Sequence, residues 1–153
     1  MKPMEITLKP ILQQEYELRF SIVKEAIYEH VDAVFGWDDD FQRKRLIDEY
    51  DPTWFYWIYN NDHRIGMLCY KPYDNSYHVH LLIVFPDFQN QGLGYMTMDY
   101  VHQLAQAEQR KSITLSSFIR NEKAVKFYKK LGYDITNVES DFYVLTRHFS
   151  AIE

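Results

Sequence analysis

The sequence predicts an α/β protein of the α+β type, with about seven strands and four helices in one domain over residues 1–153. Two kinds of apolar spacing support this prediction. Some runs are continuous or alternate as in strands, and others recur every three or four residues as in helices. The two kinds meet at residues 77–105, where a strand-like run, a turn with two glycines and a helix-like run follow one another. A chain of this length can bury one substantial core.

The expected elements follow the order β-α-α-β-β-β-α-β-α-β-β. Residues that favour turns or stop helices set their ends: Pro10 after the first strand, Gly36 between the first two helices, and Asp51 with Pro52 after the second. Three short turns rich in Asn, Asp and Ser separate consecutive strands. The expected strands are 5–9, 53–59, 64–71, 77–85, 112–118, 133–138 and 142–147, and the expected helices are 13–35, 41–50, 96–105 and 121–131.

The turn over residues 85–95 connects the most apolar strand to the start of a helix. Gly92 and Gly94 let the backbone approach a ligand closely, and the free N–H groups of a helix start attract negative charge. The turn therefore predicts a phosphate-binding loop. A P-loop is excluded because Lys and Ser or Thr do not follow Gly94, and a dinucleotide-binding loop is disfavoured because Thr97 replaces the third glycine.

The pattern Gln89-x-x-Gly92-x-Gly94 resembles the pyrophosphate loop of the GNAT superfamily of N-acetyltransferases, which bind acetyl-coenzyme A. The segment from Asn121 to Tyr133 resembles the second signature of that superfamily, Asn-x-x-Ala-x-x-Phe-Tyr-x-x-x-Gly-Phe/Tyr, at every fixed position. The two segments also lie in the order that the superfamily shows. This resemblance implies the GNAT fold, a mixed and mostly antiparallel central sheet whose fourth and fifth strands splay apart.

The resemblance further implies acetyl-CoA as co-substrate and no metal. Backbone N–H groups of the loop would hold the pyrophosphate, and the exposed backbone of the preceding strand would pair with the pantetheine arm. Asn121 matches a position whose side chain commonly meets the pantetheine, and it is equally well explained as a helix N-cap. The expected cofactor-binding residues are Leu82, Ile83, Val84, Gln89, Asn90, Gln91, Gly92, Leu93, Gly94, Tyr95 and Asn121.

Tyr128 matches the position that the superfamily uses as general acid. A phenol with a reference pKa of about 10 is protonated at neutral pH and can donate a proton to the leaving thiolate. The alternative is a purely structural tyrosine that packs beside Phe127. Cys69 is an unfavourable acyl-carrying nucleophile because it lies in an expected strand among apolar residues, so direct transfer to the amine is expected.

His78 and His80 lie two residues apart on the central strand, and therefore on one face of the sheet if no bulge intervenes. The run from His78 to Val84 resembles the arylalkylamine N-acetyltransferases, which use a His-x-His pair at this place, through waters, as proton acceptor. In that role the pair would give an apparent pKa of about 6.5 to 7.5. The alternative is two polar residues facing solvent. A metal site is disfavoured because no third ligand stands at a fixed spacing.

Acidic residues gather near the two N-terminal helices, the elements that shape the acceptor site in this superfamily. Glu29 and Asp32, together with Trp37 and the acidic residues 38–40, could attract and contact an ammonium substrate. A solvated acidic face is the plainer interpretation. The segment 35–38 resembles a group of uncharacterised bacterial GNAT proteins, which brings no substrate with it.

Composition narrows the class of partner and compartment. A formal charge of −5 argues against a nucleic-acid partner, whose binding needs a basic surface, and agrees with a cationic substrate. The single cysteine excludes a disulfide framework and fits a cytoplasmic protein. No apolar run is long enough to span a membrane, and the N-terminus shows no signal pattern.

The sequence thus predicts a cytoplasmic N-acetyltransferase that moves an acetyl group from acetyl-CoA to a small-molecule or peptidyl primary amine, as a monomer or homodimer. The alternative is a sensor or partner module with the GNAT fold that binds acyl-CoA with little turnover. The presence of Tyr128 favours the enzyme.

Overall fold

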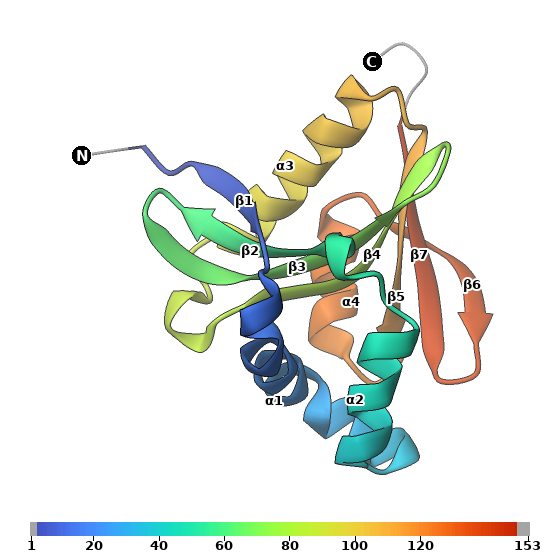
Figure 1. Cartoon of the computed structure of the whole chain (residues 1–153). Helices are drawn as coiled ribbons and strands as arrows, with labels where there is room; N and C mark the ends of the chain where they lie inside the picture. The colour runs from blue at the N-terminus through green and yellow to red at the C-terminus, as the bar shows by residue number, and fades with distance from the viewer. Residues whose placement is uncertain (1–2, 150–153) are drawn as a thin grey trace.

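In the computed structural model, which describes residues 3–149, seven strands form one mixed sheet in the order β1-β2-β3-β4-β5-β7-β6 (Figure 1). Neighbouring strands are antiparallel except β4 and β5, which run parallel. The predicted fold class and element order are confirmed. The strands are β1 (Ile6–Pro10), β2 (Phe55–Asn60), β3 (His63–Pro72), β4 (Ser76–Val84), β5 (Ser112–Phe118), β6 (Asp134–Glu139) and β7 (Phe142–His148), and the helices are α1 (Tyr16–Phe35), α2 (Asp39–Asp48), α3 (Leu93–Ala107) and α4 (Glu122–Lys130).

The sheet opens in its middle, between β4 and β5. These strands pair only where residues 76–79 of β4 meet residues 112–115 of β5. Beyond this ladder β4 continues to Val84 and β5 to Phe118, so the strands splay as expected. Ser116, on the part of β5 that pairs with β7 but not with β4, is exposed. The splay therefore leaves backbone N–H and C=O groups of β4 without a partner strand on the β5 side.

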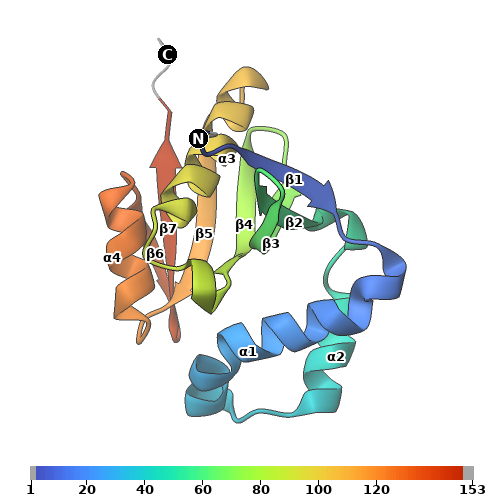
Figure 2. The same cartoon turned by 90° about the vertical axis from the view of Figure 1, so that its left-hand side faces the viewer.

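Two cores lie on opposite faces of the sheet. Helices α3 and α4 cover one face and helices α1 and α2 cover the other (Figure 2). Strand β4 contributes to both cores, because its side chains point alternately to the two faces. Val79 and Leu82 pack into the α3–α4 core, whereas Leu81 and Ile83 pack into the α1–α2 core. The two faces of β4 therefore meet different helices.

Two strand ends differ from the prediction for local reasons. Strand β1 includes Pro10, which is tolerated because β1 lies at the edge of the sheet. Strand β2 begins at Phe55 instead of residue 53. The Asp51 side chain accepts a hydrogen bond from the Thr53 N–H at 2.9 Å, which fixes a short 3-10 turn before the strand.

The first two helices also start at residues other than those expected. Helix α1 begins at Tyr16, because residues 13–15 form a 3-10 turn. Helix α2 begins at Asp39, since the Asp38 side chain accepts a hydrogen bond from the Phe41 N–H at 3.0 Å and caps the helix. Among residues 3–149, no helix is long and apolar enough to cross a membrane.

Candidate active site

A pocket of about 360 Å³ lies beside the splayed part of β4, between the glycine loop and helix α4. We call it the loop pocket. All predicted cofactor residues except Ile83 and Gln91 line it, and so does Tyr128. The structure therefore brings the two sequence signatures together. The lining residues are Leu82, Val84, Phe88, Gln89, Asn90, Gly92, Leu93, Gly94, Tyr95, Asn121, Lys123, Ala124, Phe127 and Tyr128.

The two exceptions have clear positions. The Ile83 side chain packs into the α1–α2 core, on the other face of β4. The Gln91 side chain donates a hydrogen bond to the Asp87 carbonyl oxygen at 3.2 Å and stays outside the pocket lining. The sequence analysis did not assign Lys123 to the pocket. Its position beside Ala124 in the second signature could have indicated that it lies there.

The loop presents a row of free backbone N–H groups. The Gln89 N–H donates to the Pro86 carbonyl oxygen, and the Met96 N–H donates to the Gly92 carbonyl oxygen as the first bond of α3. Among the described residues, the N–H groups of residues 90–95 between them have no backbone acceptor. A helix start leaves such groups available for an anion, whose charge the helix dipole also favours.

The shape of the loop depends on two left-handed residues and one close contact. Asn90 has φ 62° and Gly92 has φ 78°, so the chain turns sharply into α3. The Gln89 side chain donates to the Val84 carbonyl oxygen at 2.8 Å and ties the loop to the end of β4. A Cβ atom on Gly94 would lie 3.2 Å from the Phe127 ring, closer than ordinary packing allows. Glycine at this position therefore lets α3 and α4 approach each other.

Helix α4 supplies the opposite wall of the pocket. Asn121 caps the helix by accepting a hydrogen bond from the Ala124 N–H at 3.2 Å, and it also lines the pocket, so its two expected roles are compatible. The Tyr128 ring packs against Phe127 and Tyr133. Burial raises the pKa of Tyr128 above its ordinary value, so the phenol keeps its proton at neutral pH.

The model of the acetyltransferase (GNAT) family matches residues 17–133. The chain belongs to this family. The expected class, an N-acetyltransferase, is thereby confirmed. Three solved structures with a similar fold are the PaiA N-acetyltransferase from Thermoplasma acidophilum in complex with coenzyme A (12% identity, 95% of this chain and 100% of that chain, TM-score 0.73), an acetyltransferase from Thermus thermophilus (17%, 94% and 97%, 0.71), and the ribosomal-protein-S18-alanine N-acetyltransferase from Escherichia coli (14%, 95% and 95%, 0.64).

His78 and His80 lie on the α1–α2 side of β4 in this GNAT domain. The β3–β4 register shifts at His80, because Leu81 pairs with Cys69 whereas Val79 pairs with Tyr70. A bulge therefore does intervene, yet the His78 and His80 rings meet with centroids 4.7 Å apart. The two side chains therefore lie close together although the strand is irregular. Their joint role as proton acceptor stays a prediction.

Aromatic rings enclose His80. Its ring stacks on Trp54 at 5.6 Å and contacts Tyr50 at 5.0 Å. Its Nε2 atom is buried and has no hydrogen-bond partner among residues 3–149. His78 differs, because its Nδ1 atom lies 2.7 Å from the Thr114 hydroxyl oxygen on β5. His80 therefore has a buried ring nitrogen without a partner in the described part of the chain, whereas Nδ1 of His78 is engaged.

Burial lowers the pKa of both histidines. For His80 the pKa falls from 6.5 to about 4, first through burial and then through the positive charges of His78, Lys71 and Arg45. The pKa of His78 is lowered by burial and by Lys71. Both rings are therefore neutral at pH 7, and the lowered pKa makes His80 a weaker proton acceptor than a free imidazole. The apparent pKa of about 6.5 to 7.5 for the pair stays a prediction.

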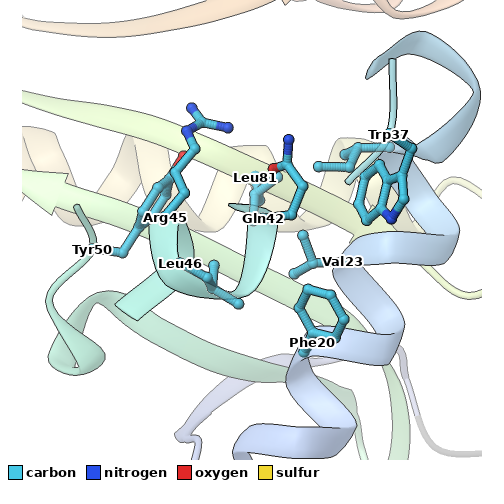
Figure 3. Close-up of a pocket in the computed structure, with 9 residues that line it drawn as sticks. Phe20, Val23, Trp37, Gln42, Arg45, Leu46, Tyr50 and Leu81 are labelled. Atoms are coloured by element: carbon cyan, nitrogen blue, oxygen red, sulfur yellow. The ribbon is translucent and has the colours of Figure 1, made fainter. Parts of the chain in front are cut away.

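A second, much smaller pocket lies on the α1–α2 side, with a volume of about 20 Å³ (Figure 3). It has room for about one water molecule. Trp37 is the one predicted substrate residue that lines it, and Gln42 and Arg45 are its polar members. The sequence did not indicate that the remaining lining residues would surround a pocket. The lining residues are Phe20, Val23, Ile27, Trp37, Gln42, Arg45, Leu46, Tyr50 and Leu81.

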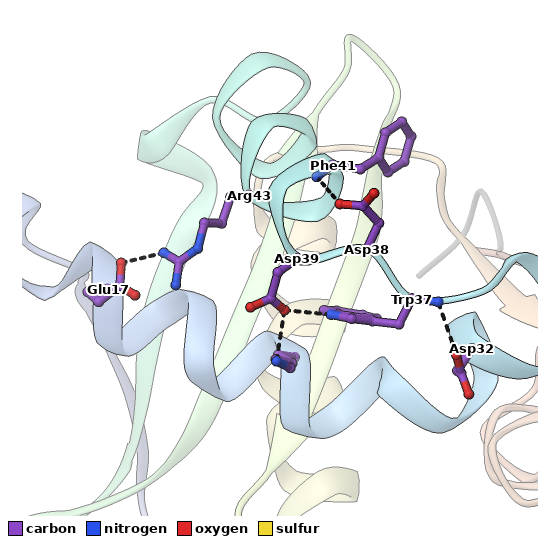
Figure 4. A network of polar contacts seen from close by, with 8 residues as sticks. Glu17, Asp32, Trp37, Asp38, Asp39, Phe41 and Arg43 are labelled. Carbon is purple, nitrogen blue, oxygen red and sulfur yellow. Dashed lines mark hydrogen bonds and ion pairs between the residues drawn. The ribbon is translucent and has the colours of Figure 1, made fainter.

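Most of the predicted acidic attractors are bonded within the α1–α2 connection (Figure 4). Asp32 accepts a hydrogen bond from the Trp37 N–H at 3.0 Å. Asp39 accepts one from the Trp37 ring nitrogen at 2.6 Å and pairs with Lys24 at 2.7 Å. Glu29 is exposed on α1. The structure thus gives Asp32 and Trp37 a structural role, and substrate binding by Glu29, Asp32 and Trp37 stays a prediction.

No group of three or more His, Cys, Asp or Glu side chains among the described residues is placed to hold a metal ion. Cys69 is buried, and burial raises the pKa of its thiol above the ordinary value, which keeps it unreactive.

Proposed function

We propose that this GNAT domain transfers an acetyl group from acetyl-CoA to a primary amine by direct attack of the amine on the thioester. The observation that carries the proposal is the row of free N–H groups of residues 90–95, which opens into a pocket that also holds Tyr128. A pyrophosphate suits this row, because it offers several anionic oxygens to the start of α3. Lys123 at the pocket wall adds positive charge.

The thioester end of the coenzyme would lie along β4. Beyond residue 79 this strand has no partner on the β5 side, so an extended amide-containing arm can bond to its free backbone groups. Leu82 and Val84 of this stretch line the loop pocket. The arm would then run from the loop toward the splay, where the separation of β4 from β5 connects the two faces of the sheet.

The chemistry needs three proton transfers: the ammonium loses one proton before attack, the nitrogen loses a second as the amide forms, and sulfur gains one. The amine nitrogen forms a bond to the acetyl carbon, and the carbon–sulfur bond breaks with its electron pair on sulfur. Tyr128, which is protonated at neutral pH, donates a proton to that thiolate, and the proton released from the new amide nitrogen restores the phenol. The ammonium form of the substrate must first lose a proton, and the neutral His80, directly or through water, is the acceptor that we propose.

The acceptor that we propose is a small-molecule or peptidyl amine. A peptidyl amine gains support from the similar fold of the Escherichia coli enzyme, whose name gives a ribosomal-protein alanine as its acceptor. The positive charges of Lys71 and Arg45 near His80 argue against polyamines, whose remaining cationic groups they would repel.

One observation favours the second candidate, an acyl-CoA-binding module with little turnover. The pocket on the α1–α2 side holds about 20 Å³, which is too small for an amine substrate. An acceptor would therefore bind elsewhere, for example at the splay beside the exposed Ser116, or would require α1 and α2 to move.

Calorimetry with acetyl-CoA, followed by acetyl transfer assays on arylalkylamines, polyamines, aminoglycosides and N-terminal peptides, tests the proposal. We expect micromolar-range coenzyme binding and turnover on at least one class. Tyr128→Phe should keep the coenzyme affinity and lower kcat by about 10²-fold. Tyr73→Phe, which removes a hydroxyl from an exposed tyrosine outside both pockets, is the control and should change neither. Coenzyme binding without transfer to any amine would support the binding module instead.

A further inference from the structure

Three polar side chains from different elements form a row next to Tyr128, in which His102 and Tyr133 are buried and Arg147 is half-buried. Arg147 on β7 places its Nη1 atom 2.8 Å from Nδ1 of His102 on α3. The Nε2 atom of His102 lies 2.8 Å from the hydroxyl oxygen of Tyr133, which follows α4. His102 is 3% exposed and Tyr133 is 2% exposed. The row therefore ties α3, the end of α4 and β7 together inside the α3–α4 side of the protein.

The direction of each hydrogen bond in the row is fixed. A guanidinium group has only donors, so Arg147 donates and Nδ1 of His102 accepts. The other ring nitrogen then carries the proton, and His102 donates to Tyr133. Burial and the charge of Arg147 lower the pKa of His102 to about 4, which agrees with a neutral ring. The row thus holds the Tyr133 ring in one orientation.

Tyr133 in turn contacts Tyr128 in two ways. The two rings pack edge to face, with centroids 5.6 Å apart and planes at 70°. The Tyr133 N–H donates to the Tyr128 carbonyl oxygen at 3.1 Å, and the Leu131 N–H donates to the same oxygen at 3.0 Å. Both the backbone and the ring of Tyr128 therefore depend on where Tyr133 lies.

We propose that Arg147, His102 and Tyr133 are positioning residues that hold the Tyr128 hydroxyl toward the loop pocket. The inference rests on the role of Tyr128 in the proposed function. A phenylalanine at position 133 together with a leucine at position 102 would fill the same space without burying a hydroxyl and an imidazole, whose desolvation costs free energy. The polar row gives the ring a fixed orientation that apolar packing alone leaves looser.

Four variants measured in the transfer assay test this proposal: Tyr133→Phe, His102→Leu, His102→Gln and Tyr128→Phe combined with Tyr133→Phe. We expect Tyr133→Phe and His102→Leu to lower kcat by about tenfold with an unchanged KM for acetyl-CoA, since misplacing a reacting group by 1 Å can cost up to about 10²-fold. Gln can accept from Arg147 and donate to Tyr133, so His102→Gln should restore most of kcat. In the Tyr128→Phe background, Tyr133→Phe should cost nothing further.

A purely structural role predicts different results. Tyr133→Phe would then lower thermal stability alone, or would lower kcat equally with and without the Tyr128 hydroxyl, and either outcome overturns the proposal. If Tyr128→Phe alone keeps the wild-type kcat, the acid role fails, and the positioning role fails with it. NMR of protein labelled at the tyrosine Cζ carbons decides without turnover. The Tyr128 resonance should move or broaden in Tyr133→Phe and His102→Leu but not in His102→Gln, and an unmoved resonance in all three contradicts the proposal.

Discussion

The two faces of β4 are built in opposite ways. On the α3–α4 side, the loop pocket of about 360 Å³ is formed by two continuous stretches, residues 82–95 and residues 121–128, and its loop presents free backbone N–H groups. On the α1–α2 side, a space of about 20 Å³ is surrounded by side chains from α1, α2, the segment after α2 and β4. The first pocket is much larger than the second.

This difference predicts that amino-acid substitutions on the two faces affect binding differently. Backbone N–H groups are present whatever the side chains, so the loop pocket depends chiefly on the conformations of Asn90 and Gly92 and on the close approach at Gly94. The other face depends on which side chains fill it, such as the Trp54 and Tyr50 rings around His80. Coenzyme binding should therefore respond to few substitutions, whereas acceptor choice should respond to many.

The largest expected effect is on the loop face. Gly92→Asp should weaken acetyl-CoA binding by about 100-fold or more, because a carboxylate would stand where the helix start attracts an anion. Gly36→Asp is the matched control: Gly36 has φ 79°, close to the 78° of Gly92, and neither glycine has a neighbour within 4 Å of an added Cβ. It carries the same strain and charge at the α1–α2 connection and should keep the affinity. Calorimetry that shows equal losses in both variants would mean that strain, not the phosphate site, is responsible.

A smaller effect is expected on the other face, from His78→Ala combined with His80→Ala. At pH 7 we expect kcat/KM to fall by about tenfold, less than the roughly 10²-fold or more of direct general catalysis, because water can also carry the proton. Acetyl-CoA affinity should stay constant, since both histidines lie outside the loop pocket.

The pH dependence sharpens this prediction. A protonated His80 cannot accept a proton, so wild-type kcat/KM should fall as the pH approaches the lowered pKa of about 4. The free energy of unfolding should decrease earlier, as the pH is lowered from 6.5 to about 4, because the unfolded histidine binds a proton at a higher pH than the folded one does. Rates are therefore compared only where circular dichroism shows folded protein. Superimposable pH profiles of wild type and double variant would remove the histidines from the mechanism.

The smallest expected effects compare one helix cap from each face. Asn121→Ala removes the cap of α4 and Asp38→Ala removes the cap of α2, and each should lower the free energy of unfolding by about 1 kcal/mol. Asn121→Ala should in addition weaken acetyl-CoA binding several-fold, because the same side chain lines the loop pocket. Thermal unfolding and calorimetry measure the two quantities separately. Equal affinities in the two variants would leave Asn121 with a capping role alone.

The contrast between the two faces of β4 also determines how much of the fold and of the candidate site could be predicted from the sequence. The fold class, the splay and almost all of the loop pocket followed from the resemblance of residues 89–94 and 121–133 to the two signatures of the superfamily. Ile83 and Gln91 were predicted to bind the cofactor through their backbone groups, so the positions of their side chains outside the pocket leave that prediction open.

The other face could not be predicted in this way. The Tyr50 and Trp54 rings and the Arg45 charge reach His80 from separate elements, and no spacing in the sequence reports that meeting. The bulge at His80 likewise arises from pairing with β3. Residues 38–40 form an acidic run that is visible in the sequence. In the structure, however, Asp38 caps helix α2 and Asp39 forms an ion pair with Lys24.

Amide hydrogen exchange with and without acetyl-CoA tests the central claim most directly, namely that the coenzyme binds to backbone groups on the loop face of β4. We predict slower exchange at the N–H groups of residues 90–95 and along residues 82–84, with little change in α1 and α2. Gly92→Asp should abolish this protection, and Gly36→Asp should keep it. Tight coenzyme binding that leaves residues 90–95 unprotected, or that protects α1 and α2 instead, would contradict the account.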